Sequence, residues 1–284
     1  MEKICPMILL AVVAVIVLFT SSCGSRNPQP VYNGKSLSEW LGDMKVGNPK
    51  QVTEPAQEAI RQIGTNALPF LLKEISDLGD LWQKVGATNF ARVGLTRLYN
   101  VRIAFKTLGP IAKPAVPALV DLLNNGNDSD CAAIALTQVD PQFAVIALTD
   151  ALTNKLIATR IAAVDALFYV RSNADIAVPN LVQCLKYEPS SQDLPQDVIM
   201  LKGFTVDILG AIHARPDIAV PVLVEALSDK EYGIRFEAAR ALGKFGNQAQ
   251  PAVPILQQIA KDDFNQKFRA YATNVIHTIQ AQSP

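Results

Sequence analysis

The sequence predicts an all-α protein, a solenoid of about six to seven stacked helical hairpins, and two observations support this prediction. The 284 residues are 49% hydrophobic but only 7% aromatic, and many small aliphatic side chains with few rings suit short helices that pack closely together. A short apolar motif built around proline also recurs along the chain, at spacings scattered around the length of a helical pair. The motif occurs after the first thirty residues, which carry a different signal.

Residues 1–22 have the pattern of a secretory signal peptide. An uninterrupted apolar run extends from Ile8 to Phe19, Lys3 precedes it, and small residues follow it directly before Cys23. As a helix, this run would span about 18 Å, less than the roughly 30 Å hydrocarbon core of a bilayer. A cleaved signal is therefore the preferred interpretation, and an uncleaved membrane anchor is the alternative.

The residues before Cys23 resemble the lipobox of bacterial lipoproteins, in which the cysteine receives a lipid and becomes the mature N-terminus. A lipobox usually has leucine three residues before the cysteine, where this chain has Thr20. The resemblance implies that Cys23 anchors the protein to a membrane of the bacterial cell envelope, on the periplasmic side. Ordinary cleavage would instead release a secreted protein.

Two short segments are predicted between the signal peptide and the repeats. Residues 23–35 contain two prolines and Asn33-Gly34 without apolar periodicity, so they predict a flexible tether. Residues 36–50 predict an N-terminal capping helix that covers the open end of the solenoid. Ser36 and Glu39 have the spacing of a capping box, and an apolar stripe follows on one face of this helix: Leu37, Trp40, Leu41 and Met44.

The recurring motif is Ala-Val-Pro-x-Leu, and its proline predicts the start of a helix. Proline is favoured in the first turn, because the N–H that it lacks would have no helical partner there. Each motif is therefore expected to begin the second helix of a hairpin, after an Ala-rich first helix. The intact or nearly intact copies contain Pro69, Pro117, Pro179, Pro221 and Pro254, and a degenerate copy without proline is centred on Val145.

The segment from Asp229 to Gly246 resembles the HEAT repeat, whose first helix carries an Asp, a Val/Ile-Arg pair, Ala-Ala and Leu-Gly. The matching residues here are Asp229, Ile234-Arg235, Ala238-Ala239 and Leu242-Gly243. The resemblance extends over about residues 50 to 281, and residues 32–41 resemble the N-terminal segment of secreted bacterial HEAT-repeat proteins. It implies a right-handed α-solenoid over residues 51–284, in which a ladder of basic residues ties each repeat to the next: Arg160, Lys202, Arg235 and Arg269.

A polar row accompanies the second helices. The residues four positions after each proline, or after Val145, are all polar, whereas the residues two and six positions after it are mostly leucine or isoleucine. In HEAT solenoids the second helices line the concave face, so the resemblance implies that this row contacts a protein or peptide partner. We call these residues the polar row: Lys73, Asp121, Thr149, Gln183, Glu225 and Gln258.

Composition and motifs argue against other classes of function. With 26 basic and 26 acidic residues, the chain has no overall positive field for a nucleic acid. It contains no GxGxxG, Walker, HExxH, CxxC or GxSxG pattern, so no catalytic residues, metal or cofactor are expected. His213 is expected to interact with unpaired carbonyls at a helix end, His277 to lie on the surface, and Cys131 and Cys184 to be buried free thiols.

The preferred function is therefore a monomeric, non-catalytic scaffold that binds a protein or peptide. A HEAT-like enzyme of the lyase type and a purely structural envelope spacer are the alternatives. Residues 81–120 carry six basic side chains without an acid, and residues 121–154 carry five acids without a base. We interpret these blocks as mutually neutralising neighbours, with an anionic partner as the alternative. Residues 80–100 exceed one repeat and predict an extra helix or an elaborated loop.

Overall fold

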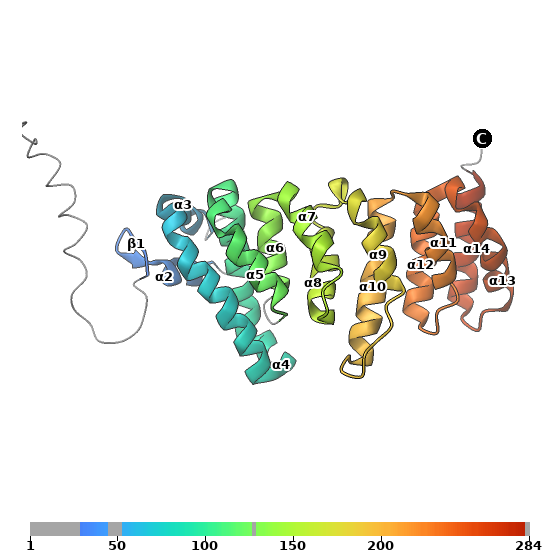
Figure 1. Ribbon diagram of the computed structural model, residues 1–284, viewed down its shortest axis with the longest axis horizontal. Helices are drawn as coiled ribbons and strands as arrows, with labels where there is room; N and C mark the ends of the chain where they lie inside the picture. Colours follow the sequence, from blue (N-terminus) through green and yellow to red (C-terminus); the bar gives the residue numbers. More distant parts are fainter. Residues whose placement is uncertain (1–28, 45–52, 127–128, 282–284) are drawn as a thin grey trace, which may run out of the picture.

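Helical hairpins stand side by side in one long row in the computed structural model (Figure 1). The structure describes residues 29–44, 53–126 and 129–281, with side chains inside residues 82–93 described only at Lys84. The predicted signal peptide, Cys23, the first part of the tether and residues 45–50 of the expected capping helix lie outside these ranges. Within them, the predicted all-α solenoid is confirmed.

Each hairpin consists of a first and a second helix, most of them joined by a short 3₁₀ segment. The first helices form one layer, in which consecutive members from α6 onward pack against one another: α3 (Thr53–Ile63), α6 (Ser129–Val139), α8 (Ile157–Leu167), α10 (Pro195–Ile212), α12 (Tyr232–Phe245) and α14 (Gln266–Ala281). The second helices form the other layer: α5 (Val116–Asn124), α7 (Pro141–Ala151), α9 (Val178–Leu185), α11 (Pro216–Ala226) and α13 (Val253–Asp262). The 3₁₀ segments are η1 (Gly64–Ala67), η2 (Gly109–Ala115), η3 (Arg171–Asn173), η4 (Asp175–Ala177) and η5 (Gly246–Ala252).

The long segment α4 (Leu68–Leu108) is helical throughout but is not a single rod. Arg97 Nη2 lies 2.9 Å from Glu74 Oε2, whereas residues 23 positions apart in a straight helix would be about 35 Å apart. The segments at the two ends of α4, η1 and η2, are also in contact. The chain therefore reverses within α4, whose arms are the second helix of one hairpin and the first helix of the next.

This reversal corrects the prediction for residues 80–100. They form neither a separate helix nor an irregular loop, because their backbone continues the helical arms of α4. The excess residues lengthen the arms instead. As a result α4 reaches beyond the neighbouring hairpins at one edge of the row, and α10 does so at the same edge (Figure 1).

The motif prolines begin helices at four of the five predicted places. Pro69, Pro117, Pro179 and Pro254 each occupy the second residue of a second helix. At the fifth place the prediction is wrong, because α11 begins at Pro216 and Pro221 lies inside it. The degenerate copy behaves similarly, since α7 begins at Pro141. In both cases a proline four or five residues upstream already occupies the first helical position, where it is favoured.

The N-terminal cap is a small β-hairpin followed by a short helix. Strands β1 (Val31–Tyr32) and β2 (Lys35–Ser36) pair across Asn33-Gly34, both of which have positive φ, as a type I′ turn requires. The tether predicted for residues 23–35 is therefore wrong for its last residues, which are ordered. Helix α2 (Leu37–Gly42) is shorter than the predicted segment, and the expected capping box of Ser36 and Glu39 is present.

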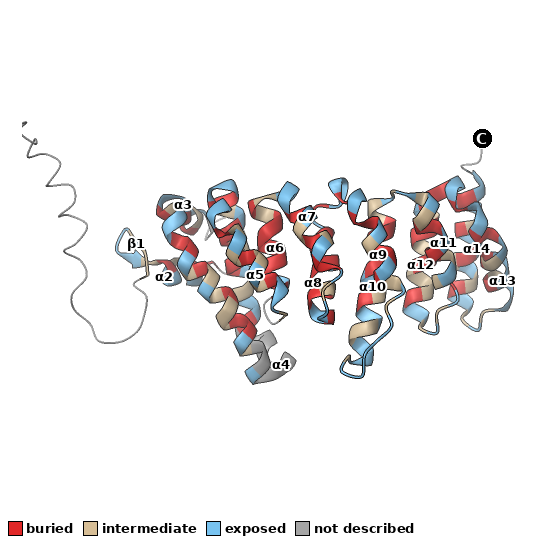
Figure 2. Ribbon diagram, viewed as in Figure 1, coloured by how far each residue is buried: buried red, intermediate tan, exposed pale blue. Residues whose placement is uncertain are grey.

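The core is continuous along the row and consists mainly of small and aliphatic side chains. Buried residues concentrate where helices face one another (Figure 2). At Gly210 in α10, a Cβ atom would lie 2.7 Å from the Cβ of Ala241 in α12, so only glycine permits this approach of the two helices. At the C-terminal end α14 buries Phe268, Val275 and Ile279 and exposes polar residues such as Thr273 and His277 to solvent. The row thus ends in a helix with a polar free face.

Candidate partner-binding surfaces

The polar row lies on the second-helix layer, one residue per hairpin. Most of its residues are exposed, but Thr149 is half-buried, donates a hydrogen bond to the Val145 carbonyl at 2.7 Å and offers its own carbonyl to Asn180. Lys73 pairs with Asp77 on the next turn of α4, at 2.6 Å. The row therefore presents exposed polar side chains on α4, α5, α9, α11 and α13: Lys73, Asp121, Gln183, Glu225 and Gln258.

The predicted ladder residues sit at the edge where one hairpin passes to the next. Each of the three arginines donates to the main-chain carbonyl six positions upstream: Arg160 to Asn154, Arg235 to Asp229 and Arg269 to Asp263, at 2.6, 2.9 and 2.7 Å. Each of these upstream residues also accepts, through its side chain, the N–H two positions later. The arginine thus fixes a turn of the same geometry in three of the repeats.

Two ladder residues also reach the following repeat. Arg235 lies 3.8 Å from the carboxylate of Asp263, and both side chains are nearly buried at 13% and 10% exposure. Lys202 lies 3.9 Å from the carboxylate of Asp229. Arg160 instead places its guanidinium 4.6 Å from the ring of Tyr187, as a cation–π contact. Along the ladder, the partner in the following repeat is therefore an aromatic ring for Arg160 and a carboxylate for Lys202 and Arg235.

Lys202 differs from the arginines because of where its helix begins. Six positions upstream is Gln196, which belongs to α10 itself and not to a turn. The loop before α10, residues 186–194, has nine residues, whereas the loop before α12, residues 227–231, has five. Lys202 therefore ties down no turn of its own repeat. In the described part of the chain its ammonium has the Asp229 carboxylate as its ion-pair partner.

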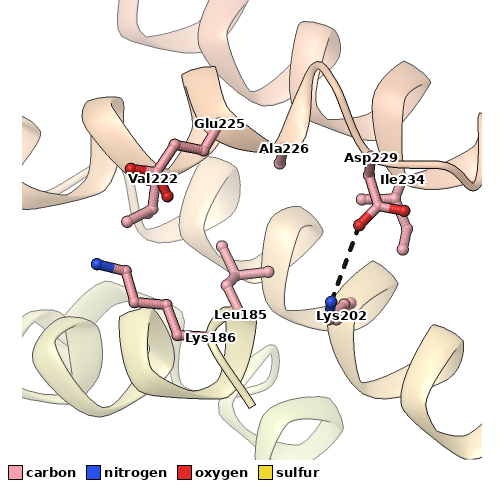
Figure 3. A pocket seen from close by; sticks show the side chains of 8 residues that line it. All are labelled: Leu185, Lys186, Lys202, Val222, Glu225, Ala226, Asp229 and Ile234. Atoms are coloured by element: carbon pink, nitrogen blue, oxygen red, sulfur yellow. Dashed lines mark ion pairs between the residues drawn. The ribbon is translucent and has the colours of Figure 1, made fainter. Parts of the chain in front are cut away.

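A groove opens at this same boundary, between α9 and α10 on one side and α11 and α12 on the other. It consists of a cavity of about 120 Å³ and a second of about 440 Å³, which share the side chains of Lys202, Asp229 and Ile234. Figure 3 shows the Lys202–Asp229 pair at one end of the smaller cavity, with Lys186 and Glu225 at the other. We call both cavities together the α9–α12 groove. Glu225 of the polar row and Lys202 of the ladder both belong to it.

The loop between α9 and α10 is held in shape by Asp193. Its carboxylate accepts hydrogen bonds from the Tyr187 hydroxyl, the Ser190 N–H and the Ser190 hydroxyl at 2.7, 2.7 and 2.8 Å. These bonds hold the pKa of Asp193 below its usual value, and the bond from Tyr187 contributes most. The same bond raises the pKa of Tyr187. This loop is therefore an ordered wall of the larger cavity, and Asp193 contributes a negative charge to that wall.

The basic block (residues 81–120) and the acidic block (residues 121–154) form ion pairs with each other only in part. Lys113 pairs with Asp140 at 2.9 Å, which is the predicted neutralisation between neighbouring repeats. Arg97 of the basic block instead pairs with Glu74, which lies outside both blocks. Arg102 donates to the Tyr169 hydroxyl at 2.7 Å. Desolvation raises the pKa of Asp165, and the positive charge of Arg102 offsets this only in part. The blocks thus neutralise one another only in part through direct ion pairs.

The residues considered for catalysis occupy structural positions. His213 ends α10 in the left-handed conformation with its ring 4.7 Å from that of Phe245. Cys131 and Cys184 are buried thiols outside any disulfide, and burial raises the pKa of the Cys184 thiol to about 11. Among the described residues no group of three or more His, Cys, Asp or Glu could hold a metal ion. No helix in the same ranges is long and apolar enough to cross a bilayer.

Comparison with known proteins gives one family match. The family model for HEAT repeats matches residues 199–276, and no curated protein matches the chain significantly in sequence. Two engineered proteins solved by the Northeast Structural Genomics Consortium have similar folds. One is 19% identical, with 86% of this chain and 96% of that chain covered and a TM-score of 0.47. The other is 20% identical, with 87% and 99% covered and a TM-score of 0.48.

Sequence reasoning missed the α9–α12 groove, although one signal pointed to it. The spacing from Pro179 to Pro221 is longer than the spacings on either side of it. These extra residues form the longer loop and the longer α10 that make the larger cavity. A long spacing alone does not show whether the added residues fill a space or enclose one.

Proposed function

We propose that this chain, a HEAT-repeat protein, is a monomeric, non-catalytic scaffold that binds a protein or peptide partner along its second-helix layer. The observation that carries the proposal is the polar row: exposed polar side chains recur at one position of five second-helix segments, directly beside a buried apolar core. A repeated, rigidly spaced surface of this kind suits an extended partner. We further propose that the protein is exported and held at the bacterial envelope through a lipid on Cys23.

Two other functions differ from the scaffold in whether the protein converts a substrate or binds a partner. A HEAT-like enzyme would convert a small molecule, and a structural spacer would neither convert a substrate nor bind a stoichiometric partner on the polar row. The described residues offer the enzyme little, because His213 and Cys184 are engaged in capping and packing. Crosslinking in native envelopes followed by mass spectrometry separates a scaffold from a spacer.

A double substitution tests the polar row. Gln183→Arg with Glu225→Arg changes two exposed side chains, so the stability should stay within about 0.5 kcal/mol of the wild type. Two long basic side chains in the middle of the row should nevertheless reduce partner recovery from crosslinked envelopes. The matched control is Gln280→Arg with Glu54→Arg, which makes the same chemical change at exposed sites outside the row. Unreduced recovery by a correctly folded row variant would overturn the proposed binding surface.

The lipid anchor has its own test. Wild-type protein in bacterial cells should incorporate labelled palmitate and partition into the detergent phase, because several acyl chains give lasting membrane attachment. Cys23→Ala should lose both properties. Cys131→Ala is the control, since that buried thiol should not affect labelling. If Cys23→Ala still incorporates the label, the anchor is not on Cys23.

A further inference from the structure

We infer that the α9–α12 groove binds an extended peptide segment whose central residue is arginine or lysine. This inference rests on the proposed scaffold function and gives part of the partner its chemistry. Three features of the groove support this inference: the cause of its opening, the charges that line it and the apolar surfaces of its walls.

The groove is open because the ladder is incomplete at this boundary. One repeat later, Arg235 donates to two carbonyls of its own turn, at Asp229 and Lys230, and also approaches Asp263. Its guanidinium therefore fills the space between consecutive turns. At the groove the corresponding residue is Lys202, which pairs with one carboxylate among the described residues and has no turn to fix. The lengthened α9–α10 loop stands away from this position, and the larger cavity lies between the two loops.

The charges that line the groove favour a cation. Five carboxylates face three ammonium groups, which leaves a net charge of −2. The Asp193 carboxylate accepts three hydrogen bonds, whereas no hydrogen bond from the described residues holds Glu188. Asp229 contributes to a long ion pair, and Glu231 stands at the start of α12. The carboxylates are Glu188, Asp193, Glu225, Asp229 and Glu231, and the ammonium groups are Lys186, Lys202 and Lys230.

The walls suit the stem of a long basic side chain. Val198, Ile199 and Ile234 give the larger cavity an apolar surface, and Ile199 is 37% exposed. Arginine and lysine bury their aliphatic stems against such surfaces while the charged end stays in a polar setting. A volume of about 440 Å³ is within the range of pockets that hold small ligands. A basic side chain with its neighbouring backbone therefore fits both the shape and the charge of the groove.

Methyl NMR of the full-length protein with matched peptides tests this inference. The probe is acetyl-Gly-Val-Arg-Ile-Gly-amide, and the comparison peptide carries Glu in place of Arg. We expect the Arg peptide to shift the methyl resonances of Ile199 and Ile234 in a saturable way, and to leave buried Ile75 in α4 unchanged. The Glu peptide should bind at least about fivefold more weakly. Equal binding of the two peptides, or no saturable shift with the Arg peptide, would overturn the inference.

Two variants outside the polar row sharpen the test. Glu188→Lys with Glu231→Lys should weaken the Arg peptide about tenfold, whereas Asp175→Lys with Asp262→Lys, the same charge change elsewhere, should not. Lys202→Met keeps the stem but removes an ammonium group, so it should strengthen binding a few-fold. A gain of this kind cannot result from misfolding. Unchanged affinity in both groove variants would overturn the inference.

The outcome for the groove is separable from that for the proposed function. If Gln183→Arg with Glu225→Arg abolishes envelope partner capture while the Arg peptide fails to bind, the scaffold function stands and the groove inference falls. If the peptide binds with the expected charge dependence while capture is unaffected by the row variant, the groove inference stands and the polar row does not. If the row variant leaves capture unchanged and the Arg peptide does not bind, both proposals fail.

Discussion

Where an arginine follows an inter-repeat turn by six positions, the joint between the repeats depends on it. Arg235 is 13% exposed, donates to the carbonyls of Asp229 and Lys230 and approaches the carboxylate of Asp263. Removing it leaves the carbonyls of Asp229 and Lys230 without this donor and the nearly buried Asp263 carboxylate without this cation. Such losses cost more than the net contribution of the bonds themselves, because the remaining groups stay desolvated.

Arg235→Ala should therefore lower the free energy of unfolding by about 2–3 kcal/mol, as measured by urea denaturation. Arg235→Lys keeps the charge but loses the fork of donors, so it should fall between the wild type and the alanine variant. Arg61→Ala is the control, because the exposed pair of Arg61 with Glu58 should contribute less than about 0.5 kcal/mol. A loss for Arg235→Ala no larger than for Arg61→Ala would contradict this role.

At the scale of the helix, identical motifs place proline in two different settings. Pro254 is the second residue of α13, where its missing N–H costs nothing. Pro221 lies inside α11, five residues after the proline that begins this helix. An interior proline removes a backbone hydrogen bond and crowds the preceding turn.

The two prolines should consequently respond with opposite signs when they are replaced by alanine. Pro221→Ala should raise the free energy of unfolding by about 1–3 kcal/mol, because an interior proline is costly relative to alanine. Pro254→Ala should lower it by about 0.5–1 kcal/mol, because a compatible proline restricts the unfolded chain. Thermal unfolding followed by circular dichroism measures both. Changes of the same sign would show that the two positions are equivalent.

At the scale of the whole molecule, a row of hairpins must close its core at both ends. The capping box helix α2 covers the first hairpin, with Leu37 and Met44 fully buried. Helix α14 covers the last hairpin and turns its polar face outward. Terminal elements of this kind keep a solenoid soluble, since each inner repeat relies on a neighbour to cover its apolar face.

Deleting α14, from Asn265 to the end, should expose Leu256 and Ile259 and lower the stability by several kcal/mol. Each such side chain contributes about 1.5–3 kcal/mol when it is fully buried. The deleted protein should also bind a hydrophobic dye and self-associate, as size-exclusion chromatography would show. His277→Ala, on the exposed face of α14, should behave as the wild type. A deletion variant with unchanged stability would mean that α14 is not a cap.

Local patterns in the sequence determined the repeated architecture of this protein. The periodic leucines, the prolines at helix starts, and Ser36 with Glu39 act within a few residues of one another, so their effect follows from the order of residues alone. The HEAT-like spacing also indicated Arg235, although not that its main partners are carbonyls of its own turn.

Only the tertiary structure decided the features that join distant residues. The reversal of α4 is visible in the contact of Arg97 with Glu74, which no local pattern specifies. The start of α11 at Pro216 depended on competition between two prolines, each compatible with a helix start. The α9–α12 groove combines residues from four helices and two loops. A cavity results from how far packed elements stand apart, and that distance is set by side chains far away in the sequence.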